Sequence, residues 1–109
     1  MRIRVYAGQR MLGPGKMELL QCISKLGSLS AAAREMRMSY MRAWTLVKEL
    51  NQDSSRSMVL LSRGGVSGGT ARVTPFGRKV LALYQQMDRE SRKVAAPYGQ
   101  QLTRLLKRN

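Results

Sequence analysis

Residues 28–51 read Ser-Leu-Ser-Ala-Ala-Ala-Arg-Glu-Met-Arg-Met-Ser-Tyr-Met-Arg-Ala-Trp-Thr-Leu-Val-Lys-Glu-Leu-Asn. Apolar residues recur with helical spacing on either side of Arg37-Met38, which predicts two short amphipathic helices joined by a tight turn. The second helix has a polar, basic side opposite its apolar one. This is the arrangement of a helix-turn-helix, in which the second helix buries one side and offers the other to a DNA groove.

The charge of the chain favours an anionic partner. Its 109 residues include 20 Lys and Arg but 6 Asp and Glu, which gives a formal net charge of +14. A surface this positive attracts polyanions, of which nucleic acid and anionic membranes are the usual ones, although a basic surface that serves only solubility is an alternative. We therefore expect double-stranded DNA as the partner of a single-domain protein.

Residue types needed for catalysis and metal binding are scarce. There is no His, and the single cysteine, Cys22, rules out an internal disulfide and a multi-cysteine zinc site. Cys22 lies in a helical apolar pattern and is predicted to be a small buried residue. Without paired carboxylates or a nucleophile beside a base, we expect no enzymatic activity and no cofactor.

Membrane and export signals are also missing from the sequence. No apolar run approaches the length of a membrane span. The first residues, Met1–Tyr6, lack the apolar stretch of a signal peptide. We therefore expect a cytoplasmic protein that makes no membrane contact.

Segments before the motif are predicted to be a strand and a helix. Ile3 and Val5 alternate with polar residues, as in a short strand with one solvated face. A helix is expected from Pro14 to Leu26. Gly27 follows at a position where a helix end favours positive φ.

Within the motif, capping and burial follow from residue type. Ser28 or Ser30 can cap the first helix, and Ser39 the second, which extends to about Asn51. The small side chains of the run 31–33 let another helix pack closely. The buried side of the second helix is predicted to be Ala43, Trp44, Val47 and Leu50, with Trp44 in the core rather than stacked on a base.

After the motif and a polar loop, the pattern changes to a hairpin and a helix. Met58–Arg63 and Thr70–Thr74 are predicted strands, joined by the glycine-rich tip Gly64–Gly69. Thr74-Pro75 suits the start of a helix that we expect to end near Val94, before Pro97 and Gly99.

The predicted fold is therefore mainly α with a small β-hairpin wing, a winged helix-turn-helix in the order β-α-α-α-β-β-α. Residues 1–96 are expected to form the DNA-binding domain with a C-terminal dimerisation helix. Residues 97–109 are expected to be a basic tail, frayed or in a short helix.

Contacts from the second helix of the motif are predicted by side-chain chemistry. Arg42 suits a bidentate contact with guanine, which discriminates between bases by about 1–3 kcal/mol. Thr45 suits a thymine methyl, Lys48 a phosphate, and Ser39 a phosphate at the helix start. For each position, a solvated surface residue is the alternative. The predicted contacts are Ser39, Tyr40, Met41, Arg42, Thr45 and Lys48.

The hairpin is predicted to touch the DNA backbone or a minor groove. Its glycines lack the lysine of a nucleotide-binding loop, so a phosphate loop is disfavoured. No acidic residue occurs between Ser54 and Met87, which leaves the arginines of this stretch unopposed. The predicted contacts are Arg63, Ser67, Arg72 and Arg78.

These residues resemble the N-terminal DNA-binding domain of the ModE molybdate-responsive regulators and, more distantly, the winged helix of LysR-type regulators. The likeness covers about residues 11–90. It is carried by residues 27–33, Met38-Ser39-Tyr40, Ala43-Trp44, Asn51, the Gly-Gly-x-x-Gly-Gly wing, Thr74-Pro75-x-Gly77 and Tyr84.

The resemblance implies a bacterial, homodimeric transcriptional regulator. The N-terminal strand and the first and last helices would form the subunit contact, and Ser39, Tyr40, Arg42 and Thr45 would face bases or phosphates. Met41 stands where that family is expected to have a basic residue, and Arg42 beside it can supply the charge. The likeness stops where the family's molybdate-binding domains would begin, so we expect no molybdate binding by this chain alone.

Two other functions use the same features. A nonspecific or architectural nucleic-acid-binding protein would need the same charge but would show no preference among duplex sequences. A protein-interaction module would pair with a larger regulator through the helix Phe76–Val94. A cationic membrane-surface protein is disfavoured because the apolar stripes are needed for a core.

Overall fold

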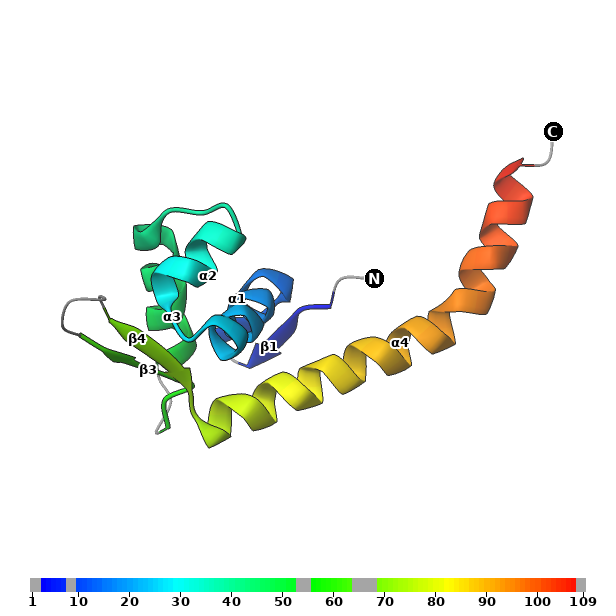
Figure 1. Cartoon of the computed structure of the whole chain (residues 1–109). Coiled ribbons are helices and arrows are strands. Elements are labelled where there is room, and N and C mark those ends of the chain that lie inside the picture. Colours follow the sequence, from blue (N-terminus) through cyan, green and yellow to red (C-terminus); the bar gives the residue numbers. More distant parts are fainter. Residues whose placement is uncertain (1–2, 8–9, 53–55, 64–68, 108–109) are drawn as a thin grey trace.

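A computed structural model describes residues 3–7, 10–52, 56–63 and 69–107 of the chain. A short antiparallel ribbon, β1 (Val5–Ala7) and β2 (Arg10–Leu12), precedes three helices, a hairpin and a long last helix (Figure 1). The helices are α1 (Pro14–Leu26), α2 (Leu29–Glu35) and α3 (Tyr40–Asn51), the hairpin strands are β3 (Val59–Ser62) and β4 (Thr70–Val73), and the last helix is α4 (Pro75–Lys107).

This order confirms the mainly helical fold with a β-hairpin after the helix-turn-helix, with one difference at the start. The sequence predicts one N-terminal strand around Ile3 and Val5, but the structure has two, and Val5 pairs with Leu12. Arg10–Leu12 shows no alternation over only three residues, so its strand character comes from the pairing and not from its own pattern.

The core lies where α1, α2, α3, the hairpin and the start of α4 meet. α1 packs on α2, α3 and β4, and α2 packs on α3. Cys22 is half-buried against this cluster, and burial raises the pKa of its thiol, with a further contribution from Glu35. The buried side chains are Met17, Leu19, Leu20, Ile23, Leu29, Ala32, Ala33, Ala43, Leu46, Val47, Leu50, Met58, Val59, Ala71, Val73 and Leu81.

The prediction that Trp44 belongs to this core is wrong. Its side chain is 39% exposed, whereas Leu46 is only 6% exposed. The buried positions Ala43, Leu46, Val47 and Leu50 follow the i, i+3, i+4, i+7 spacing of one helix face. Trp44 lies about 100° around the helix from Ala43, because each residue turns by that angle, and so falls at the edge of the face.

The predicted caps are present at the helices of the motif. The Ser28 hydroxyl accepts from the Ala31 N–H at 3.1 Å, and the Ser39 hydroxyl accepts from the Arg42 N–H at 3.0 Å. Gly27 ends α1 with a φ of 69°, the left-handed conformation expected there. The helix-turn-helix is therefore specified locally at both helix starts.

Asn51 connects the end of α3 to the hairpin. Its side-chain oxygen accepts from the N–H groups of Met58 at 2.8 Å and Val59 at 3.1 Å. Its amide nitrogen donates to the Val59 carbonyl at 2.9 Å. Three hydrogen bonds from one side chain fix where β3 begins relative to α3.

Thr74 caps α4 as predicted, but the helix continues beyond the predicted end near Val94. The Thr74 hydroxyl accepts from the Gly77 N–H at 3.0 Å, and α4 runs through Pro97 to Lys107. Figure 1 shows α4 leaving the body and bending in its orange part, the segment that contains Pro97. A proline removes one hydrogen bond and bends a helix, and the helix formers on both sides let it continue.

We predict that Gly77→Ala destabilises the fold by about 1–3 kcal/mol, the usual cost of overpacking. A Cβ at this position would lie 2.5 Å from the Met58 carbonyl oxygen and 2.9 Å from the Val73 side chain. Urea denaturation followed by circular dichroism measures the change. Gly99→Ala is the matched control, because a Cβ there meets nothing within 4 Å and alanine favours the helix by about 0.5–1 kcal/mol. Equal shifts in the two variants would contradict the packing argument.

Candidate nucleic-acid interface

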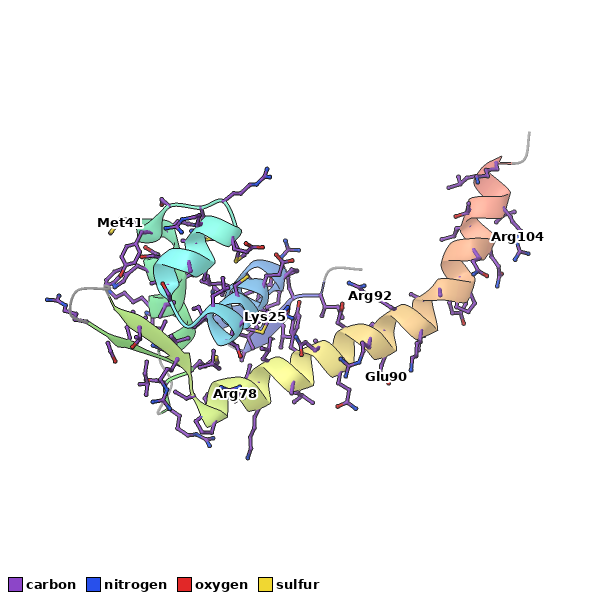
Figure 2. The ribbon with its side chains drawn as sticks, viewed as in Figure 1. Lys25, Met41, Arg78, Glu90, Arg92 and Arg104 are labelled. Atoms are coloured by element: carbon purple, nitrogen blue, oxygen red, sulfur yellow. The ribbon has the colours of Figure 1, made fainter. Side chains whose placement is uncertain are left out.

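The side of α3 that faces away from the core carries the residues predicted to contact DNA. Ser39, Tyr40, Met41, Arg42 and Lys48 are exposed, and Thr45 is half-buried. Figure 2 shows Met41 pointing outward at the start of α3, and 65% of its surface is exposed. The structure therefore leaves these six residues on an open surface and does not bury them in the protein.

Two of the hydroxyls on this surface already have partners within α3. The Ser39 oxygen accepts the Arg42 N–H, and the Thr45 hydroxyl donates to the Met41 carbonyl at 2.9 Å. Each oxygen keeps lone pairs that can accept further hydrogen bonds. Thr45 is thus held in one rotamer, which directs its methyl group and its free acceptor sites in a fixed direction.

A hollow of about 590 Å³ lies between the starts of α2 and α3 and the hairpin. It brings the predicted contacts Tyr40 and Met41 together with Arg63, which comes from the end of β3. Its lining also includes residues that the sequence did not single out as contacts. These are Leu29, Ser30, Trp44, Leu61, Ser62, Gly69 and Thr70.

Trp44 also lines a second hollow of about 410 Å³, together with Lys48, Gln52 and Leu61 among others. The Lys48 ammonium lies 5.4 Å from the centre of the indole ring, within the range of a cation–π contact. Trp44 therefore positions a basic side chain on the exposed side of α3. A helical wheel alone could have placed it at the edge of the buried face and so at the surface.

Acidic residues do not neutralise this surface in the described part of the chain. The first turn of α3 contains no acidic residue, and Glu49 is bound at 3.1 Å by Lys16 of α1. No carboxylate within the described ranges forms an ion pair with Arg42, Arg63 or Arg72. The positive charge around α3 and the hairpin is thus available to an anion.

The residues predicted to contact DNA from the hairpin and its flank do not lie in one place. Arg63, which directly follows β3, and Arg72 of β4 are both exposed, and Arg72 lies opposite Leu60 in the pairing. Arg78 lies in the first turn of α4, and Figure 2 shows it well apart from Met41. Ser67 lies outside the described residues. Among the predicted hairpin contacts that the structure describes, Arg63 is thus the one that lines the same hollow as the start of α3.

Other kinds of site are not evident among the residues that the structure covers. Within them, no group of three His, Cys, Asp or Glu side chains is placed to hold a metal ion. None of the described helices is both long and apolar enough to cross a membrane.

A helix-turn-helix followed directly by a β-hairpin defines a winged helix-turn-helix protein. The same fold occurs in ArgP, a LysR-type protein from Mycobacterium tuberculosis, with a TM-score of 0.57 and 21% sequence identity. That match covers 79% of this chain and 30% of ArgP. No protein-family model matches the chain.

By sequence, the chain is a homologue of ModE-type proteins, as the resemblance predicted. It is 37% identical over 95 residues to the molybdenum-pterin-binding protein MopB of Rhodobacter capsulatus, covering 87% of this chain and 35% of MopB. It is also 37% identical over 71 residues to the DNA-binding transcriptional dual regulator ModE of Escherichia coli, covering 65% of this chain and 27% of ModE. The chain spans about a third of the length of the curated relatives it matches.

We predict that acrylamide quenches the fluorescence of Trp44, the single tryptophan, in the folded protein. The indole is partly exposed and lines two hollows, so the quencher can reach it, but less freely than in the unfolded chain. Stern–Volmer plots with and without urea give the comparison. Emission that resists quenching until the protein unfolds would show that Trp44 is buried.

Proposed function

We propose that this chain is a sequence-specific, double-stranded-DNA-binding transcriptional regulator of the cytoplasm. The start of α3 enters a major groove, and the hairpin lies on the flanking backbone. One observation carries the proposal: the same helix buries Ala43, Leu46, Val47 and Leu50, leaves Arg42 and Lys48 exposed, and shares a hollow with Arg63 through Tyr40 and Met41. The name of the ModE relative, a DNA-binding transcriptional regulator, supports the same function.

Each predicted contact has a role in this proposal. Arg42 reads a base edge, Tyr40, Met41 and Thr45 lie against bases or the sugar-phosphate backbone, and Lys48 neutralises a phosphate. Arg63, Ser67 and Arg72 follow the backbone beside the groove, and Arg78 extends this contact past the base of the hairpin. Ser39, which caps α3, places a phosphate at the helix start.

The proposed regulator acts as a homodimer through α4. Beyond the body of the protein this helix exposes Val94, Tyr98, Leu102 and Leu105. Their spacing of three and four residues puts them on one side of the helix, where a second copy can cover them. Val5 and Tyr6 of β1 are exposed as well, so the N-terminal strand can also contact the partner. A dimer presents two copies of α3 to successive major grooves of a palindromic site.

Molybdate binding is not assigned to this chain alone. The names of the relatives refer to molybdenum, but the similarity covers about a third of their length. We assign to this chain the winged helix-turn-helix and its interface with DNA.

We predict that Arg42→Ala relaxes base preference and lowers affinity for the selected site by about tenfold or more, since a bidentate base contact contributes about 1–3 kcal/mol. Lys48→Ala and Arg72→Ala should weaken binding to all duplexes alike and reduce the slope of log K against log salt by about 1 each. Fluorescence anisotropy with a duplex selected from a random pool, and with scrambled competitors, measures both effects. Equal affinity of the wild-type protein for selected and scrambled duplexes would favour the architectural protein instead.

We predict that Leu102→Glu weakens self-association by at least tenfold, because it puts a charge into the apolar row of α4. Sedimentation equilibrium over a range of concentrations gives the dissociation constants. Gln100→Glu is the matched control, since it adds the same charge on the opposite side of the helix. A monomeric wild-type protein, or equal effects of the two variants, would argue against the α4 dimer.

A further inference from the structure

The turn between α2 and α3 contains an unusual backbone conformation. Arg37 has a φ of 56° and is the one described residue other than glycine with positive φ. Its N–H donates to the Arg34 carbonyl at 3.1 Å, and the Met38 N–H donates to the Ala33 carbonyl at 2.9 Å. This pair of hydrogen bonds is the Schellman motif, in which the left-handed residue is usually glycine.

The end of α1 shows the usual solution in the same chain. Gly27 takes the left-handed position there, with a φ of 69°. An arginine at the corresponding position of α2 places a Cβ atom in a conformation that disfavours it. Backbone conformations of this kind are held in place by the surrounding structure and are found preferentially at functional sites.

Packing does not explain the arginine. Its neighbours Met36 and Met38 are partly buried against the core, whereas Arg37 is exposed. Within the described residues, no carboxylate forms an ion pair with Arg37. The turn therefore presents one cationic side chain to solvent and uses the residues on either side of it for the core.

The position of Arg37 indicates what it binds. It lies two residues before Ser39, the cap of α3, and the first turn of α3 has no acidic residue. N–H groups at a helix start carry partial positive charge, so a DNA phosphate that approaches α3 there also approaches the turn. A guanidinium can bind two oxygens of such a phosphate at once.

We propose that Arg37 is a DNA-binding residue that contacts a backbone phosphate at the start of α3 and so fixes how α3 sits in the groove. This inference rests on the proposed function. It adds a residue outside the predicted contact set. It also explains why a residue that strains the turn occupies this position.

Three substitutions at Arg37 separate charge from backbone strain. Arg37→Gly removes both, Arg37→Gln removes the charge and keeps the Cβ atom, and Arg37→Lys keeps both. We expect Arg37→Gly to raise the urea midpoint by roughly 0.5 M, with the other two near wild type. We expect Arg37→Gly and Arg37→Gln to lower DNA affinity by about tenfold and to reduce the slope of log K against log salt by about 1. Arg37→Lys, which keeps the charge but not the planar guanidinium, should have an intermediate effect.

Arg104→Gln is the matched control, because it removes the same charge from the far end of α4, well away from Met41 (Figure 2). Affinity and salt slope should stay within about twofold of wild type in this variant. An Arg37→Gly protein that binds like wild type would overturn the inference while the proposed function stands. So would weaker binding accompanied by lower stability. A wild-type protein that binds no duplex at low salt would remove the proposed function and this inference with it.

Discussion

The close packing of α3 on α2 is the contact on which the rest of the interface depends. Ala32 and Ala43 are fully buried, and Ala33 nearly so, where these two helices meet the core. Side chains this small let the helix axes approach, and a larger residue would move α3 away from α2 and from the hairpin. The hollow that joins Tyr40 and Met41 to Arg63 exists only while this spacing is kept.

The distribution of charge follows from the same packing. The ion pairs among the described residues are Lys16–Glu49, which joins α1 to α3, and two pairs along α4, Asp88–Arg92 and Lys93–Glu90. Each uses an acidic residue at a place other than the exposed start of α3. Because acids are few, using them there leaves Arg42 at the start of α3 and Arg63 and Arg72 of the hairpin without an ion-pair partner among the described residues. These unpaired cations add to the long-range attraction that the net charge of +14 exerts on a polyanion.

Local signals made the motif predictable, and missing local signals explain the errors. Ser28, Ser39 and Thr74 cap helices through their own side chains, so residue type alone identified three helix starts.

Trp44 is apolar, but its position one residue past Ala43 takes it off the buried face, and residue type outweighed geometry in that prediction. Pro97 is a helix breaker by propensity, yet α4 continues through it with a bend. The strand 10–12 depends on its partner and has no pattern of its own. The turn conformation of Arg37 contradicts its residue type, so only the structure reveals it.

The backbone of Met58 connects α3, the helix proposed to enter the DNA groove, to α4, the proposed dimer helix. Its N–H is bound by the Asn51 side chain at the end of α3, and its carbonyl accepts from the Thr74 N–H at the start of α4. The Thr74 hydroxyl also donates to the Ser57 carbonyl, and the Met58 side chain is buried. Two helices fixed to one short backbone segment cannot change their mutual angle freely. The distance between the two copies of α3 in a dimer is then set by α4, and with it the spacing of the half-sites that the protein can bind.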